Sequence, residues 1–284
     1  MAENENLPWS LVVTPKSRWF HLNLKEIWRY RDLLVLFLRR DVVTVYKQTI
    51  LGPLWFIIQP ILTTVIFTII FGNIAEISTD GLPHVLFYLS GIILWNYFAD
   101  CLKATADAFK SNENIFGKVY FPRVIVPLST ILSNLIKFGI QFLLFIGVLI
   151  YFSFKMDLHD IGPDIILFPF LLVMVAGLSL GFGMIISSLT TKYRDLSFLI
   201  SFGIQLVMYA TPVIYPLSEA PEKYKIFILA NPISSLIEAF RYIFLGSGAI
   251  DFYYLLYSLI FTIVILFLGL VVFNKTEKTF MDTV

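Results

Sequence analysis

The sequence has few charged residues and almost no cysteine. Charged residues make up 14% of the 284-residue chain, against about 25% in soluble domains. Cys101 is the single cysteine, which excludes a disulfide framework and a cysteine-based metal site. The net charge of +1 argues against a nucleic-acid partner, which would need a basic surface.

Signatures of nucleotide binding and catalysis are missing as well. The chain has no G-x-x-x-x-G-K-[ST] loop, the element with which P-loop proteins bind ATP. His21, His84 and His159 do not have the spacing of metal ligands. The polar first thirty residues do not fit a cleavable signal peptide. We expect a chain with no catalytic site, no metal and no cofactor of its own.

Apolar residues are abundant instead. Hydrophobic residues make up 58% of the chain, more than a soluble protein of this length could hide from water. Six apolar stretches are each near the roughly 20 residues that cross a bilayer as a helix. We therefore predict an all-α polytopic membrane protein with six transmembrane helices. The predicted spans are 50–71, 85–102, 126–152, 165–189, 196–214 and 254–273.

The distribution of Lys and Arg predicts the orientation. Sixteen of these residues lie before the first span, in every second connection and after the last span, whereas the alternate connections hold four. Positive connections stay in the cytoplasm, so both termini are expected there. We predict one domain over 1–284, with a cytoplasmic lead at 1–49, a six-helix bundle at 50–273 and a cytoplasmic tail at 274–284.

The lead contains a basic amphipathic segment. Asn23 precedes Glu26 by three residues, as in a capping box. Trp28, Arg29 and Arg31 then belong to a helix of the kind that lies in the membrane interface. The alternative is a solvated helix that packs on another subunit.

The connection at 215–252 predicts a further, shorter helix. Asn231-Pro232 is a cap followed by proline at the first helical position, and Gly246 ends the apolar stripe that follows. Fourteen residues are too few to span. We expect short non-spanning helices on the outer face, either a gate or a passive cover.

Polar side chains recur at four-residue spacing within the spans, which places them on single helix faces. Such stripes either join helices through hydrogen bonds or line a channel. Lys137 is different, because an ammonium inside a span marks a pathway or an ion pair, and Asp100 is the possible partner. The candidate channel residues are Gln59, Trp95, Tyr97, Lys137, Gln141, Gln205 and Tyr209. Separately, Gly177 and Gly181 predict a close approach of helices within the subunit or between two copies.

Several segments together resemble the permeases of ABC transporters that export polysaccharide (ABC type-2). They are the run 40–55 ending in Gln59-Pro60, the upstream segment 28–33, the segment 114–123 and the short loop 192–195. The resemblance covers residues from about 12 to the end, and Gly117 departs slightly from the family pattern.

This resemblance implies a homodimer joined to two separate ATP-binding subunits, which would hold ATP and magnesium. It implies a multi-pass protein of the bacterial cytoplasmic membrane that exports undecaprenyl-linked glycans such as O-antigen, capsule or teichoic acid, with a channel between the two permeases. The residues expected to contact the ATPase are Asn114, Phe116, Lys118, Tyr120, Phe121, Pro122, Arg123, Lys192, Tyr193, Arg194 and Asp195.

Three alternative functions remain to be weighed. A permease of the same fold could export a drug or a lipid, although those relatives usually lack the aromatic and basic lead helix. A membrane enzyme would need clustered Asp, Glu or His at a membrane face, which this chain lacks. A passive channel would not need the docking segment 116–123.

Overall fold

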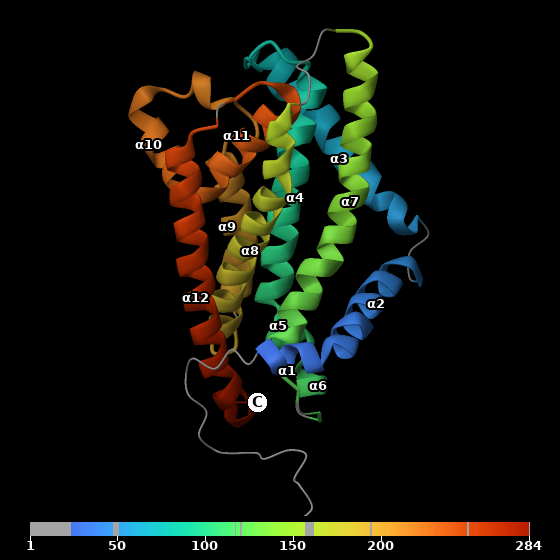
Figure 1. The fold of residues 1–284 in the computed structure, drawn as a ribbon, viewed down its shortest axis with the longest axis vertical. Helices are drawn as coiled ribbons and strands as arrows, with labels where there is room; N and C mark the ends of the chain where they lie inside the picture. The colour runs from blue at the N-terminus through green and yellow to red at the C-terminus, as the bar shows by residue number, and fades with distance from the viewer. Residues whose placement is uncertain are drawn as a thin grey trace, which may run out of the picture.

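The structure is a computed structural model and is an elongated bundle of helices (Figure 1). It describes residues 24–47, 51–116, 118–119, 121–156, 162–193, 195–248 and 250–283, and within these ranges every regular element is helical. The predicted all-α class is confirmed. Asn23, Gly117, Tyr120 and Arg194 lie outside the described residues.

Five helical segments are long and apolar enough to cross a membrane. All five correspond to predicted spans, and their ends differ from the predicted ones by a few residues except at the carboxyl end of α12, where the helix continues well past residue 273. They are η1–α3–η2 (Gly52–Leu54, Trp55–Phe67 and the π-helical Thr68–Ile74), α4 (His84–Ala106), α7 (Ile125–Ser153), η3–α8 (Pro163–Leu167 and Phe168–Thr190) and α12 (Phe252–Thr283).

The fifth predicted span is shorter than expected. Helix α9 covers only Leu196–Tyr209, so its 14 residues rise about 21 Å and fall short of the roughly 30 Å hydrocarbon core. The prediction that this helix continues to residue 214 is wrong, because the chain turns at Ala210 before Pro212, whose ring is incompatible with a continuing helix.

Two short helices follow α9, as the sequence predicts. The chain first makes a 3₁₀ turn, η4 (Leu217–Glu219). The two helices that follow, α10 (Glu222–Ala230) and α11 (Pro232–Leu245), then meet at an angle of 100°. The Asn231 side chain caps α11 by accepting from the Ile233 N–H, and Gly246 ends the helix with a φ of 66°. Helix α11 is buried on nearly all sides, so it is inserted into the bundle and does not lie on its surface.

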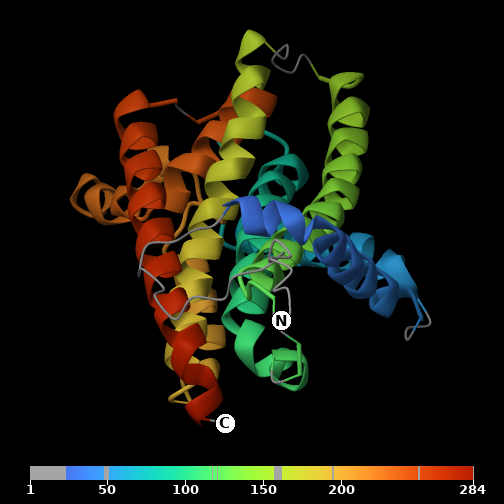
Figure 2. The same cartoon turned by 60° about the horizontal axis from the view of Figure 1, so that its bottom comes forward.

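The amino-terminal helices α1 (Leu24–Arg29) and α2 (Arg31–Lys47) are separated by a break at Tyr30. They lie toward the same end of the bundle as the carboxyl end of α12 (Figures 1 and 2). The short helices α5 (Ala108–Ser111) and α6 (Glu113–Phe116) also lie there. We call this the α6 end and the opposite end, which carries α10, the α10 end.

Helix α4 forms the centre of the bundle, and α8 joins it to α12 through glycines. A Cβ atom on Gly269 would lie 2.5 Å from the Gly181 carbonyl oxygen, and one on Gly181 would lie 2.8 Å from the backbone of Ile265. The close helix approach predicted for Gly181 is therefore made within the subunit, against α12.

This contact gives a stability prediction. Gly269→Ala should destabilise the fold by about 1–3 kcal/mol, because the added methyl group must push two backbones apart. Gly139→Ala is the matched control, since a Cβ there meets nothing within 4 Å and alanine favours a helix. Thermal unfolding of the purified proteins measures the difference. Equal midpoints for the two variants would contradict this packing.

Candidate functional site

The segment between α4 and α7 forms a compact structure at the α6 end. Helices α5 and α6 follow α4 directly, and Phe121 then leads into α7. Phe109, Phe116 and Phe121 are each at most 4% exposed. Phe116 and Phe121 of the predicted docking segment therefore point inward, and they fix the segment to the bundle.

Five phenylalanine rings form a continuous chain through this region, which we call the aromatic chain. Ring centroids are 5.7 Å apart for Phe37 and Phe121, 5.7 Å for Phe121 and Phe116, and 5.8 Å for Phe116 and Phe109. Phe109 then stacks on Phe273 of α12 at 4.5 Å. Because packed rings transmit displacement with little compression, a push on α6 reaches both α2 and α12.

Arg123 strengthens the connection to α12. Its Nη1 donates to the Glu277 carbonyl oxygen at 2.9 Å, its Nε lies 3.9 Å from the Glu277 carboxylate, and its guanidinium lies 5.2 Å from the Phe116 ring. Burial lowers the pKa of Arg123 from its usual value, and the negative charge of Glu277 offsets part of this effect. The guanidinium is thus an internal link, in contrast to the exposed position that a docking cation would need.

Other residues of the segment face outward. Asn114 and Lys118 are exposed, and so is the apolar Val119 at 59%. The second predicted docking loop, between α8 and α9, exposes Lys192, Tyr193 and Asp195. Both surfaces lie at the α6 end (Figure 1), so one partner could contact both. The sequence did not predict Val119 as a docking residue, because an apolar residue type gives no sign that the side chain is exposed.

The serine hydroxyls of the polar stripes bond mainly within their own helices, whereas the buried Gln141 Nε2 has no partner among the described residues. Ser129 and Ser201 donate to carbonyl oxygens three and four positions earlier. The single proton of the Ser133 hydroxyl has two acceptors within reach, the Ser129 carbonyl at 2.8 Å and Asp41 of α2 at 3.3 Å. The expectation of hydrogen bonds between helices thus holds for Ser133, whereas the bonds of Ser129 and Ser201 are internal to α7 and α9.

Apart from Lys137, the candidate channel residues fall into two groups. Trp95, Tyr97 and Gln141 are at most 3% exposed, so they lie inside the protomer and line no open passage there. Gln59, Gln205 and Tyr209 are exposed on α3 and α9, two helices that both pack on α4. Only Gln59, Gln205 and Tyr209 therefore have the exposure that a channel wall requires.

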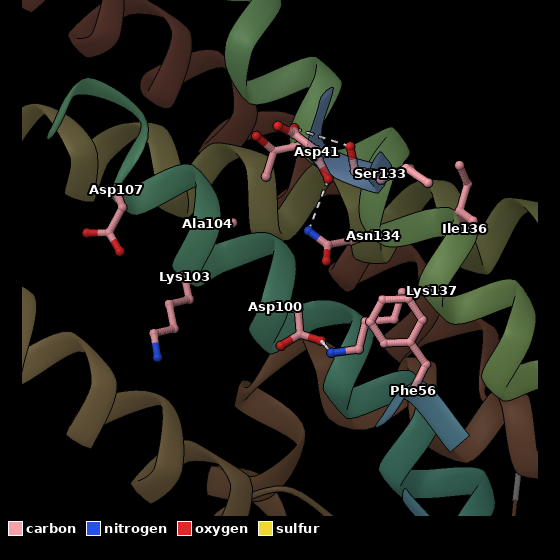
Figure 3. A pocket seen from close by; sticks show the side chains of 12 residues that line it. Asp41, Phe56, Asp100, Lys103, Ala104, Asp107, Ser133, Asn134, Ile136 and Lys137 are labelled. Carbon is pink, nitrogen blue, oxygen red and sulfur yellow. Dashed lines mark hydrogen bonds and ion pairs between the residues drawn. The ribbon is translucent and has the colours of Figure 1, made fainter. Parts of the chain in front are cut away.

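Lys137 pairs with Asp100, as the sequence suggests. Its Nζ lies 2.6 Å from Asp100 Oδ2 and 5.5 Å from the centre of the Phe56 ring. The pair borders a cavity of about 470 Å³ between α2, α4 and α7, and Figure 3 shows the two side chains pointing toward each other. Geometry thus establishes the ion pair for Lys137.

Arg241 organises the α10 end. It is 1% exposed, and its Nη1 donates to the Pro212 carbonyl at 2.5 Å and to Glu238 at 3.2 Å. Its Nη2 donates to the Val213 carbonyl at 2.8 Å. The guanidinium also lies 3.7 Å from the Phe87 ring centre. The signal that could have revealed it is the Glu238/Arg241 spacing of three in an apolar helix.

A neighbouring glycine makes room for this side chain. A Cβ on Gly91 of α4 would lie 2.8 Å from Arg241 Nη2. Arg241 Nε also approaches Ser90 at 3.4 Å. The guanidinium therefore joins α4, α11 and the irregular segment after α9, and it satisfies carbonyls that a bilayer cannot.

The described residues were also searched for a metal site. Among the described residues, no group of three or more His, Cys, Asp or Glu side chains could hold a metal ion. The interfacial candidates Trp28, Arg29 and Arg31 are exposed, and the Arg31 guanidinium lies 5.6 Å from the Trp28 ring.

Comparison with known proteins gives a consistent result. The profile of a family described as ABC-2 type transporter matches residues 32–245. The chain is 30% identical over 251 residues to the O-antigen export system permease protein RfbA of Klebsiella pneumoniae, which covers 88% of this chain and 94% of the relative. It is 24% identical to the protein of that name from Myxococcus xanthus, covering 92% and 98%. It is 25% identical to the polysialic acid transport protein KpsM of Escherichia coli, covering 86% and 93%.

The Arg241 cluster gives a prediction. Arg241→Leu leaves Glu238 as an unpaired buried charge and two carbonyls without donors, which should cost about 3–5 kcal/mol. Arg241→Lys should be intermediate, because one ammonium does not reproduce the planar fork of donors. Membrane levels and thermal midpoints measure both.

Lys225→Ala provides the control for this experiment. It removes the more exposed pair with Glu222 on α10, and exposed pairs contribute about 0–1 kcal/mol. Arg241→Leu protein as stable as the control would show that the cluster does not anchor the α10 end.

Proposed function

Because the chain belongs to the ABC-2 type transporter family, we propose that it is the membrane subunit of an ATP-driven exporter of undecaprenyl-linked polysaccharide. It is a multi-pass protein of the bacterial inner membrane. The observation that carries the proposal is the near full-length similarity to permeases named for O-antigen and polysialic acid transport. That similarity favours a glycan over a drug or lipid.

The α6 end supports a separate ATPase subunit as the energy source. It exposes Asn114, Lys118 and Val119 on a segment whose buried rings belong to the aromatic chain. In this proposal ATP and magnesium bind to the partner, two copies of which dock on two copies of this chain. The partner pushes on α6, and Phe121, Phe116 and Arg123 transmit the movement.

Exposed polar side chains support a second copy of the chain. Ser201 and Gln205 on α9 and Gln59 on α3 are exposed at levels where lipid would otherwise surround them. Polar side chains within a membrane face protein or water. A homodimer with a channel between the protomers gives these residues such surroundings, and Tyr209 adds an aromatic surface for a sugar ring.

This proposal places the cytoplasm at the α6 end. Most of the positive charges counted in the sequence lie in or near α1, α2 and the segment 103–123, which lie toward that end (Figure 1). Helices α10 and α11 then face the outside. The buried α11 is held in place by its packing, whereas the exposed α10 is the element that could move as a gate.

The substrate assignment is tested in the producing cell. Deletion of the chain should abolish the surface glycan and cause lipid-linked glycan to accumulate inside, because synthesis continues without export. Surface staining and glycan extraction from inner membranes measure both pools, and re-expression of the chain is the control. Normal surface glycan in the deletion strain would refute the assignment.

The docking surface gives a second test. Val119→Asp should weaken binding of the ATPase subunit about tenfold or more, because burying an unpaired charge in an interface costs on the order of 2 kcal/mol. Co-purification and ATP hydrolysis by the complex measure the effect, and the chain alone should hydrolyse no ATP.

Lys223→Glu is the control, since Lys223 is exposed on α10 at the opposite end. An unchanged amount of bound ATPase with Val119→Asp would contradict docking at α6. ATP hydrolysis by the isolated chain would contradict the proposal that a separate subunit hydrolyses ATP. Phe121→Ala is less suitable, because the ring is 3% exposed and its loss destabilises the fold itself.

A further inference from the structure

Charged side chains gather in the cavity beside Lys137, outside the docking surface and outside the exposed faces of α3 and α9. The walls of this cavity come mainly from α2, α4 and α7 (Figure 3), and we call it the α2 pocket. Asp41 lies on α2, Asp100, Lys103 and Asp107 lie on α4 or directly after it, and Lys137 lies on α7. Three carboxylates and two amines therefore share one space, so they can pair in more than one way.

Two ion pairs at the pocket are formed in the structure. The Lys137 Nζ lies 2.6 Å from Asp100 Oδ2 and thereby joins α7 to α4. Arg40 approaches only one oxygen of Asp41, with its Nε 2.9 Å and its Nη2 2.8 Å from Oδ1. The other oxygen, Oδ2, has the Ser133 hydroxyl at 3.3 Å and no cation among the described residues. This oxygen of Asp41 is therefore able to accept a second cation.

Lys137 is the cation nearest in position to that oxygen along α7. Asp41 contacts α7 at Ser133, and Lys137 follows Ser133 by four residues, a rise of about 6 Å along one face of the helix. The flexible four-carbon stem of a lysine side chain covers much of that rise. The cavity of about 470 Å³ leaves room for the stem to swing, whereas a close-packed interior would resist the movement. A small shift of α2 toward the level of Lys137 then brings the ammonium to Asp41.

Lys103 keeps the charges balanced when Lys137 leaves Asp100. A carboxylate left without a cation at this depth would be costly. Lys103 follows Asp100 by three residues on α4, the spacing at which side chains on a helix surface meet. It forms no ion pair with a residue that the structure describes. Lys103 can therefore replace Lys137 at Asp100, so that both carboxylates retain a cation.

A push on α6 moves Asp41 in the direction that this exchange needs. Helix α2 is attached to the region of α5 and α6 through Arg40, which donates to Asn112 at 3.1 Å, and through the aromatic chain. Helix α7 runs from the α6 end toward the α10 end, so Lys137 lies farther from the α6 end than Ser133 does. A push that carries α2 into the bundle therefore moves Asp41 from the level of Ser133 toward that of Lys137.

We propose that Lys137 is a switch residue, paired with Asp100 in the state that the structure shows and with Asp41 once the ATPase subunit has pushed on α6. This inference rests on the proposed function. In the first state Lys137 holds α7 against α4. In the second state it holds α7 against α2, while Lys103 pairs with Asp100. The exchange lets α2 and α7 move together relative to α4, which passes the push from the docking surface into the bundle.

Carbodiimide cross-linking reads the ion pairs of the unaltered chain, because the reagent joins an amine to a carboxylate in contact with it. The complex of the chain with its ATPase subunit would be treated without nucleotide and with a non-hydrolysable ATP analogue, and mass spectrometry would identify the linked peptides. The link between Lys137 and Asp100 should fall about fivefold or more with the analogue, the lower end of the usual coupling between two sites. Links from Lys137 to Asp41 and from Lys103 to Asp100 should appear instead.

The ion pair on α10 is the internal control for this experiment. Lys225 lies 2.7 Å from Glu222 at the opposite end of the bundle, so the yield of their link should be the same in both samples. With that control unchanged, the absence of a link between Lys137 and Asp41 in the presence of the analogue would overturn the exchange.

Reversal of the resting pair distinguishes a switch from a static ion pair. In the double variant Asp100→Lys, Lys137→Asp the two side chains can still pair, so its thermal midpoint should exceed that of either single variant. Export should nevertheless be lost, because the carboxylate now on α7 repels Asp41. Asp41→Asn should lose export as well, since it removes the second partner. Asp32→Asn, which changes an exposed carboxylate on the same helix, should export like the wild type.

The contrary outcomes separate this inference from the proposed function. Full export by the double variant, or by Asp41→Asn, would show that a fixed pair is sufficient and would overturn the switch alone. A chain that binds no ATPase subunit, and whose deletion leaves the surface glycan unchanged, would overturn the proposed function itself.

Discussion

The fold depends on the requirement that backbone carbonyls within a bilayer find donors inside the protein. Helix α9 stops about one and a half turns short of its predicted end, and the chain after it is irregular at Pro212 and Val213. The Arg241 guanidinium supplies donors to both carbonyls. These contacts satisfy two carbonyls at the point where the chain leaves the α9 helix and turns toward α10 and α11.

The two ends of the bundle then have different mechanical properties. The α10 end is fixed by a buried arginine joined to α4, α11 and the segment after α9. The α6 end is connected by packed rings and by Arg123, which bonds to the last helix. In the proposed function, a force on α6 would be passed through these contacts to α2 and α12, while the far end of the bundle stays fixed. This arrangement suits a permease whose energy comes from another subunit.

Much of this architecture was predictable from the sequence, because a helix that crosses a bilayer needs a long apolar stretch, and such stretches are visible in the sequence itself. The helix Pro232–Leu245 was predictable from its cap, its proline and Gly246. Other features depend on the packing partner. Nothing in the sequence distinguishes Trp95 and Tyr97, which are buried, from Tyr209, which is exposed. The role of Arg241 was not predictable, because its carbonyl partners lie about thirty residues earlier, beyond the reach of helical periodicity.

ATP-driven translocation in a reconstituted system tests the central claim most directly. The chain and its ATPase subunit would be placed in vesicles that contain lipid-linked glycan, with the α6 ends facing the added ATP. A membrane-impermeant glycosidase outside then reports how much glycan remains accessible. The account predicts that accessible glycan falls only when ATP is hydrolysed and the chain is present. An unchanged accessible fraction during active hydrolysis by the assembled complex would contradict it.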